Sequence, residues 1–193
     1  MIYELHDEDE LDEVSLQDCS IEELDASYVI FRESTLENVN FSDVTLYKPE
    51  FIRTTFIGCD LSNINLEDAT LHYCKFINCK LVGTHMVEAS LREVSFENCQ
   101  CNYIGLGSSN LKDCHFESCK LGLAGMSNCK MNQVTFNECQ MEGVELNGTK
   151  LKGIDLSNSD ISGIHVRLED MKGVKLNDIQ ALEIIKMFGI IIV

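Results

Sequence analysis

The sequence has few basic residues and no long apolar run. Its 193 residues include 32 Asp and Glu against 15 Lys and Arg, giving a formal net charge of −17 at pH 7. This charge disfavours direct binding of nucleic acid or an anionic membrane, because both would repel the protein. No apolar run approaches the ~18 residues of a membrane span, and the acidic start MIYELHDEDELDE lacks the positive charge of a signal peptide. We therefore expect a soluble cytoplasmic protein.

The apolar pattern has no insertion or skipped position. Every fifth residue from Leu11 to Leu176 is apolar, which makes thirty-four consecutive positions. This period matches neither the 3.6 residues of a helix nor the 2.0 of a flat strand, so the chain must turn every five residues. A second period of twenty appears in the strings FIGCD at 56, FINCK at 76, FENCQ at 96, FESCK at 116 and FNECQ at 136. Four five-residue sides therefore make one coil of a solenoid.

Each side of the predicted coil carries one large apolar residue and, two positions earlier, one small or β-branched residue. Both are expected to point inward, and each coil buries them against its neighbours, so several coils must stack to be stable. Glu169 falls at an inward position, where a carboxylate is costly to bury, and we expect the last coil to open there. The predicted organisation is an acidic N-terminal segment at 1–15, a rod of about eight coils at 16–176, and a C-terminal helix with a tail strand at 177–193.

The ten cysteines are interpreted as core residues. Nine occupy the small inward position and Cys101 a central one, where a free thiol behaves as a small apolar side chain. No CxxC pair suggests zinc. Only His85 and His165 share a repeat register among the five histidines, and about 19 Å of coil spacing separates them, too far for a common metal.

No other motif indicates chemistry. GLGSSN at 105 lacks the strand, helix and lysine of a phosphate loop. No nucleophile, base and oxyanion donor assemble along the chain. We therefore predict no catalytic, cofactor-binding or metal-binding residue, and we expect a protein that is not an enzyme.

Individual five-residue units carry a family resemblance. CDLSN at 59, INLED at 64, SNLKD at 109 and IDLSN at 154 each consist of a small or β-branched residue, Asp or Asn, a large apolar residue and two variable positions. In this pattern the sequence resembles the pentapeptide-repeat family over about residues 29 to 178. The resemblance implies an all-β solenoid, more specifically a right-handed quadrilateral β-helix.

The last seventeen residues depart from the repeat. Asn177 or Asp178 can cap a helix, which Gly189 can end, and residues 190–193 are predicted to form a strand. The helix can cover the open end of the solenoid. Helix and tail carry more apolar surface than one cap needs, so we expect a two-fold homodimer contact. The residues assigned to this contact are Leu182, Ile185, Phe188 and Ile190.

This ending also resembles that of the bacterial quinolone-resistance pentapeptide proteins. By this resemblance the chain is a homodimeric mimic of B-form DNA that binds DNA gyrase or topoisomerase IV. In plasmid-borne members, loops interrupt the repeat and contribute to drug protection, whereas this repeat is unbroken between 29 and 178. We assign Glu67, Asp68 and Glu88 to the partner-facing surface. The alternative is a repeat scaffold or adaptor for another protein, with the acidity serving solubility.

Overall fold

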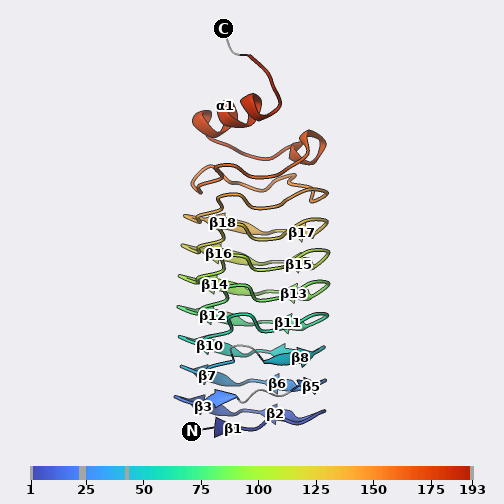
Figure 1. Ribbon diagram of the computed structural model, residues 1–193, viewed down its shortest axis with the longest axis vertical. Helices are drawn as coiled ribbons and strands as arrows, with labels where there is room; N and C mark the ends of the chain where they lie inside the picture. The colour runs from blue at the N-terminus through green and yellow to red at the C-terminus, as the bar shows by residue number, and fades with distance from the viewer. Residues whose placement is uncertain (1, 22–24, 42–43, 192–193) are drawn as a thin grey trace.

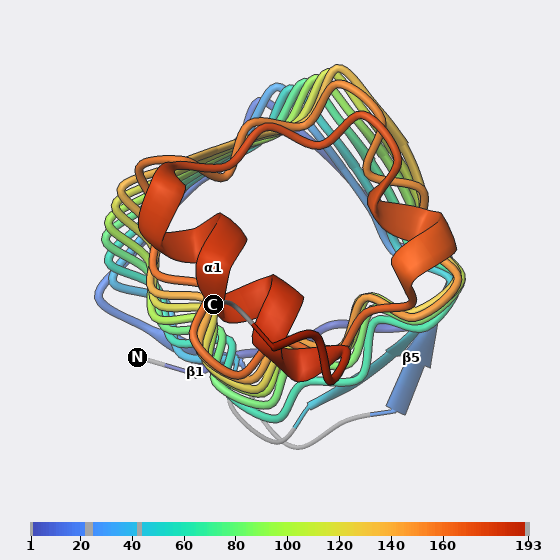
Figure 2. The ribbon, with the colours of Figure 1, turned by 90° about the horizontal axis from the view of Figure 1, so that it is seen from above.

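The chain forms a rod of stacked coils. The computed structural model describes residues 2–21, 25–41 and 44–191, and it shows a parallel β-solenoid of about seven turns with one C-terminal helix (Figure 1). Ladder partners are twenty residues apart, as in Phe56 opposite Phe76 and Leu71 opposite Leu91. Seen from above, the coils superimpose into one closed outline with the helix across its end (Figure 2). The predicted solenoid is confirmed.

Two of the four sides of the rod are seven-stranded parallel sheets. The first long sheet consists of β2 (Glu10–Asp12), β6 (Ile30–Arg32), β9 (Glu50–Ile52), β11 (Thr70–His72), β13 (Ser90–Arg92), β15 (Asn110–Lys112) and β17 (Lys130–Asn132). The second long sheet consists of β3 (Ser15–Gln17), β7 (Thr35–Glu37), β10 (Thr55–Ile57), β12 (Lys75–Ile77), β14 (Ser95–Glu97), β16 (His115–Glu117) and β18 (Thr135–Asn137).

The other two sides are held mainly by single bridges between successive coils. The third side includes the bridges that join residues 40, 60, 80, 100, 120, 140 and 160, and the fourth side those that join 45, 65, 85, 105, 125, 145 and 165. Short strands add to these sides near the N-terminus: β1 (Ile2–Tyr3) pairs with β4 (Ser20–Ile21), and β5 (Asp25–Ser27) pairs with β8 (Thr45–Tyr47).

Left-handed residues turn the chain at its corners. The residue two positions after a central apolar residue has a positive φ along much of the rod, as at Glu93 and Asn98, both at 53°. Asn, Asp and Gly adopt this conformation most readily, which explains their frequency at these positions. The corner residue also faces outward at most of these positions. The five-residue period therefore reflects one left-handed corner per side.

Stacked phenylalanine rings fill part of the interior. Phe56, Phe76, Phe96, Phe116 and Phe136 are all at most 2 % exposed, and successive ring centroids are 4.4, 4.8, 4.7 and 5.1 Å apart. The coil spacing thus places each ring at stacking distance from the next. Such stacks contribute beyond the area they bury.

The cysteines lie inside the rod as free thiols, and all ten are buried. Cys99 is typical, because its Sγ lies 3.3 Å from the carbonyl oxygen of Phe76 in the preceding coil. Burial raises the pKa of the Cys74 thiol to about 12, so that it stays protonated at neutral pH. A protonated, buried thiol is neither a nucleophile nor a metal ligand.

The last coil departs from the expected pattern at Glu169. A 3₁₀ helix at Leu168–Met171 shifts the chain by one position, so Glu169 is exposed and Asp170 is buried instead. The Asp170 carboxylate accepts hydrogen bonds from Lys150 Nζ at 2.7 Å and from the Gly148 amide at 2.8 Å, and these bonds lower its pKa. The expectation of an inward Glu169 was therefore wrong, because the helical turn provides a better-paired carboxylate.

Helix α1 (Asp178–Met187) covers the C-terminal end of the rod. Asn177 and Gln180 form a reciprocal capping box, as the sequence suggested for Asn177. Ile184 is buried at 6 % exposure. The expected tail strand is absent at residues 190–191, which are neither helix nor strand, and residues 192–193 lie outside the described residues. No helix in the described part of the chain has the length and apolarity of a membrane span.

Candidate functional site

The N-terminal coils concentrate negative charge. Residues 1–31 contain eleven acids and no Lys or Arg, whereas residues 32–176 contain nineteen acids and fourteen bases. Arg32 neutralises part of this charge, since its Nη1 lies 2.9 Å from Glu10 and 3.5 Å from Asp12. Asp7 accepts a hydrogen bond from the Ser27 amide in the next coil at 2.7 Å. The N-terminal end is therefore a densely acidic surface with one basic counter-ion among the described side chains.

The three acids predicted to face a partner lie close together on the rod. Glu67, Asp68 and Glu88 are all exposed, and Asp68 and Glu88 are equivalent corner residues of adjacent coils, each with φ of 59°. Asp68 forms an ion pair with Lys48 at 3.5 Å. The solenoid thus brings these side chains together, but a neighbouring lysine neutralises one of them, and their binding role remains a prediction.

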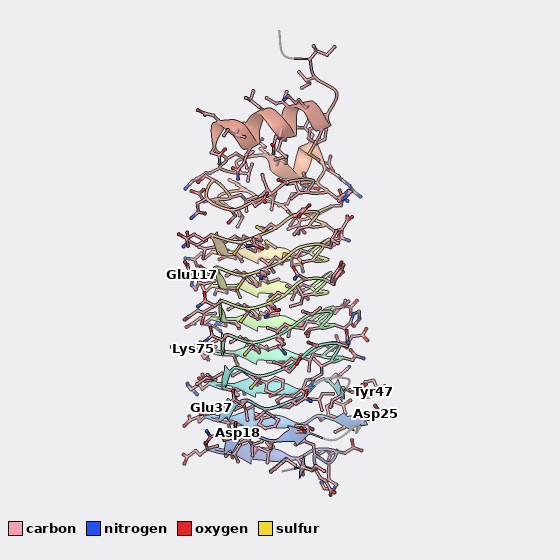
Figure 3. The ribbon with its side chains drawn as sticks, turned by 60° about the vertical axis from the view of Figure 1, so that its left-hand side comes forward. Asp18, Asp25, Glu37, Tyr47, Lys75 and Glu117 are labelled. Atoms are coloured by element: carbon pink, nitrogen blue, oxygen red, sulfur yellow. The ribbon has the colours of Figure 1, made fainter. Side chains whose placement is uncertain are left out.

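A second acidic group follows the second long sheet. Glu37, Glu97 and Glu117 occupy equivalent outward positions, and the register places Ile57 and Ile77 between the first two. Figure 3 shows Asp18, Glu37, Lys75 and Glu117 along one edge of the rod. The two isoleucines divide this column, so its negative charge is discontinuous.

One outward column of the first long sheet is mostly basic. Its successive residues are Asp12, Arg32, Ile52, His72, Arg92, Lys112 and Asn132. In two adjacent coils this column is basic at Arg92 and Lys112, whereas the column on the neighbouring side is acidic at Glu97 and Glu117. This segregation cannot be read from net charge, and it makes an acidic contact directional.

The four residues predicted to form the dimer contact differ in their exposure to solvent. Leu182, Phe188 and Ile190 are exposed by 44, 36 and 55 %, and Ile179 on the same helix by 72 %. Ile185 is partly covered. The C-terminal end therefore presents several exposed apolar side chains, and the dimer itself remains a prediction.

Other candidate chemistry is sparse in the described residues. They contain no group of three or more His, Cys, Asp or Glu side chains arranged to hold a metal. The hollows lie on the surface, and one of about 450 Å³ is lined by Tyr73, Lys75, Glu93, Asp113 and His115, among others. The His115 ring contacts the Thr135 hydroxyl at 2.9 Å, an exposed pair. The charged and apolar outer surfaces are thus the principal candidates for function.

We compared the chain with solved structures and with curated proteins. HetL, a pentapeptide repeat protein involved in heterocyst differentiation regulation from the cyanobacterium Nostoc sp. strain PCC 7120, matches with a TM-score of 0.61 at 21 % identity, over 89 % of this chain and 91 % of HetL. A trypsin-treated form of QnrB1, a plasmid-mediated fluoroquinolone resistance protein, gives a TM-score of 0.47 at 19 % identity, over 94 % of this chain and 99 % of that one. No curated protein matches the chain significantly.

The sequence family provides the assignment. The family described as pentapeptide repeat region matches residues 49–113 and 109–184, which together span most of the chain. The matched ranges include the regular coils and extend into the C-terminal helix. This chain belongs to the pentapeptide repeat family.

Proposed function

We propose that this protein is a non-enzymatic DNA mimic that binds DNA gyrase or topoisomerase IV and modulates the enzyme or protects it from quinolones. The supporting observation is the charge density of the N-terminal coils. The described part of residues 1–31 places nine acids within about one and a half coils, or ~7 Å of rod at ~4.8 Å per coil. B-DNA carries about four charges over the same length. A basic groove that accepts DNA would also attract this end of the rod.

The rest of the rod restricts how such a groove can engage it. The basic column on the first long sheet would repel a DNA-binding surface, whereas the corner at Glu67, Asp68 and Glu88 would attract one. We propose that the partner contacts the N-terminal end and this corner together. Electrostatic complementarity of this kind sets orientation and association rate more than affinity.

A gyrase supercoiling assay tests the proposal. Purified protein at micromolar concentration is expected to alter supercoiling, with and without ciprofloxacin, and to bind the enzyme directly. Glu4, Glu8, Glu13 and Asp25 are surface acids whose side chains belong to no described ion pair. Changing all four to the corresponding amides should weaken binding roughly tenfold at low salt.

A matched control uses the divided acidic column. Glu37→Gln, Glu97→Gln and Glu117→Gln remove three charges elsewhere on the rod and should change binding much less. Absence of both gyrase binding and any effect on supercoiling would refute the proposal. Equal losses in the two variant sets would instead point to net charge alone.

We also propose that the protein is a homodimer through its C-terminal end. Leu182→Asp with Ile185→Asp places two carboxylates on the apolar surface of α1 and should abolish this contact, because their desolvation is costly. Sedimentation would then give half the mass of the wild-type assembly. Glu183→Gln, on the same helix and exposed, should leave the mass unchanged. A double aspartate variant with wild-type mass contradicts the assignment.

The second candidate function is a scaffold or adaptor for a different protein. It is favoured by the neighbouring basic and acidic columns at Arg92 and Lys112 and at Glu97 and Glu117, which suit a specific partner surface as well as a DNA-binding groove. HetL, which shares the fold, is described as involved in a regulatory process. This candidate predicts no response of gyrase, so the supercoiling assay separates the two.

A further inference from the structure

One region of this highly charged rod carries no charge. Residues 98–111 and 121–129 contain no Asp, Glu, Lys, Arg or His. These segments lie on the third and fourth sides in consecutive coils, because Gln100 bridges Lys120 and Gly105 bridges Gly125. Interfaces are depleted in charged residues at their centres and enriched in Tyr. The position of this uncharged area between charged coils requires a physical explanation.

Two exposed apolar side chains stand at the corner of this area. Tyr103 is 61 % exposed and Leu123 is 53 % exposed, and they are equivalent residues of adjacent coils. Both have left-handed backbones, with φ of 62° and 57°, where Asn or Gly is far more favourable than Leu or Tyr. Local stability therefore favours neither residue at its position. Both side chains expose apolar surface beside the uncharged segments.

The next two coils lack side chains at this corner. The equivalent residues are Gly143 and Gly163, and the Leu123 side chain leans over Gly143. The result is a hollow of about 440 Å³ beside the two projecting side chains. Its lining consists of Asn102, Tyr103, Gly122, Leu123, Glu142, Gly143, Ser162 and Gly163.

The order of these residues is self-complementary about the coil of Leu123. Consider two rods packed side by side and antiparallel, with a two-fold axis at this coil. A residue that lies a given number of coils before this coil in one copy is then opposite the equivalent residue that lies the same number of coils after it in the other copy. Tyr103 of one copy, one coil before Leu123, then lies opposite Gly143 of the other copy, one coil after it. There the Tyr103 ring packs on the Leu123 side chain that covers this glycine. By the same symmetry Asn102 faces Glu142, and an amide can donate to a carboxylate.

The charges further from the axis follow the same symmetry. In one ladder, Lys80 lies two coils before residue 120 and Asp160 lies two coils after it. Lys80 of one copy would therefore lie opposite Asp160 of the other, with the opposite charge. The one like-charge pair is Lys120 with its own equivalent, and this side chain is exposed and long enough to turn into solvent. A parallel arrangement would instead place Glu142 on Glu142 and Tyr103 on Tyr103. The antiparallel arrangement is therefore the better fit.

We propose that the hollow between Tyr103 and Gly163, which Glu142 alone lines with a charge, is a lateral docking surface for a second copy of this chain in the antiparallel arrangement. Net charge restricts where two copies can meet: each carries −17, so they repel least at a surface with few charges. The opposed Lys80 and Asp160, and Asn102 opposite Glu142, favour a second copy as the occupant. A basic partner would use the acidic coils instead. The surface is separate from α1, so lateral and end-on contacts are independent.

Engineered cysteines test the arrangement directly. The ten native thiols are buried, so Asn102→Cys and Glu142→Cys introduce the reactive ones. Within one chain these positions are two coils apart, about 9.6 Å, which exceeds the ~7 Å limit for a disulfide. The double variant, and an equal mixture of the two single variants, should form a covalent dimer on non-reducing gels. Neither single variant alone should do so.

Side-chain variants give a second readout. With the end-on and lateral contacts both formed, the wild-type assembly would contain four chains, so the Leu182→Asp, Ile185→Asp variant, at half that mass, should be a lateral dimer of the 21.8 kDa chain. Adding Tyr103→Asn with Leu123→Asn should reduce it to monomer without lowering the melting temperature. Tyr28→Asn is the matched control, because Tyr28 is 56 % exposed with φ of 58° but lies elsewhere. The proposal is overturned if the double cysteine variant forms no crosslink, if single variants crosslink alone, or if the Asn variants leave the mass unchanged.

Discussion

Phe96→Ala is expected to lower the free energy of unfolding by about 3–5 kcal/mol. Phe96 is fully buried, and its ring stacks on Phe76 at 4.8 Å and on Phe116 at 4.7 Å. The ladder bonds hold the neighbouring coils at fixed spacing, so the cavity cannot collapse and the loss should lie near the upper limit. Each coil contacts only its neighbours, so the substitution weakens the junction between the two halves of the rod. Chemical denaturation measures the change.

Phe96→Leu is the matched control. Leucine occupies the same column at Leu16 and Leu36, and it fills most of the volume, so it should cost no more than about 1.5 kcal/mol. Glu97→Gln, one residue further on the same strand and outward-facing, should change stability little. A loss below about 1 kcal/mol for Phe96→Ala would show that the ring stack does not hold the coils together.

Gln180→Leu is expected to destabilise the C-terminal end by about 2–3 kcal/mol. Gln180 is 6 % exposed, and its Nε2 donates to the carbonyl oxygens of Leu156 and Ser159 at 2.8 and 2.7 Å. Its Oε1 accepts the Asn177 amide at 2.9 Å. Leucine preserves the size but removes all three bonds, so buried polar groups lose a partner. Hydrogen exchange should then show faster exchange in α1 and the last coil.

The control for this prediction is Glu183→Gln, which changes an exposed residue of the same helix. It should leave both the exchange rates and the melting temperature unchanged. If Gln180→Leu were as stable as the wild type, then Ile184 and the capping asparagine would suffice to dock the helix. The account of α1 as a cap fixed by one buried amide would then be wrong.

The five-residue apolar period was enough to predict the solenoid. Only a chain that turns every five residues keeps thirty-four equally spaced apolar residues inside, and the twenty-residue ladder register confirms this geometry. The period also placed the cysteines in the core. It failed at Glu169, because a 3₁₀ turn moves Asp170 inward, where Lys150 and Gly148 provide its hydrogen bonds.

The candidate binding residues were less predictable. Leu182, Phe188 and Ile190 are exposed, which suits an interface, whereas helical spacing alone did not separate the partly covered Ile185 from the buried Ile184. The missed feature was the corner with Tyr103 and Leu123. Its sequence signal was the absence of charge over residues 98–111 and 121–129, which matters once those segments are seen to be stacked.

The sequence by itself determined the coil, the inward side chains and the sign of the net charge, because these follow from a strict local period and composition. Only the tertiary structure decided which outward side chains share a surface. Stacking places residues twenty positions apart in contact, so Arg92 joins Lys112 on one side and Glu97 joins Glu117 on another. The docking of α1 depends likewise on buried hydrogen bonds from Gln180 to a distant coil, and a local pattern does not contain that information.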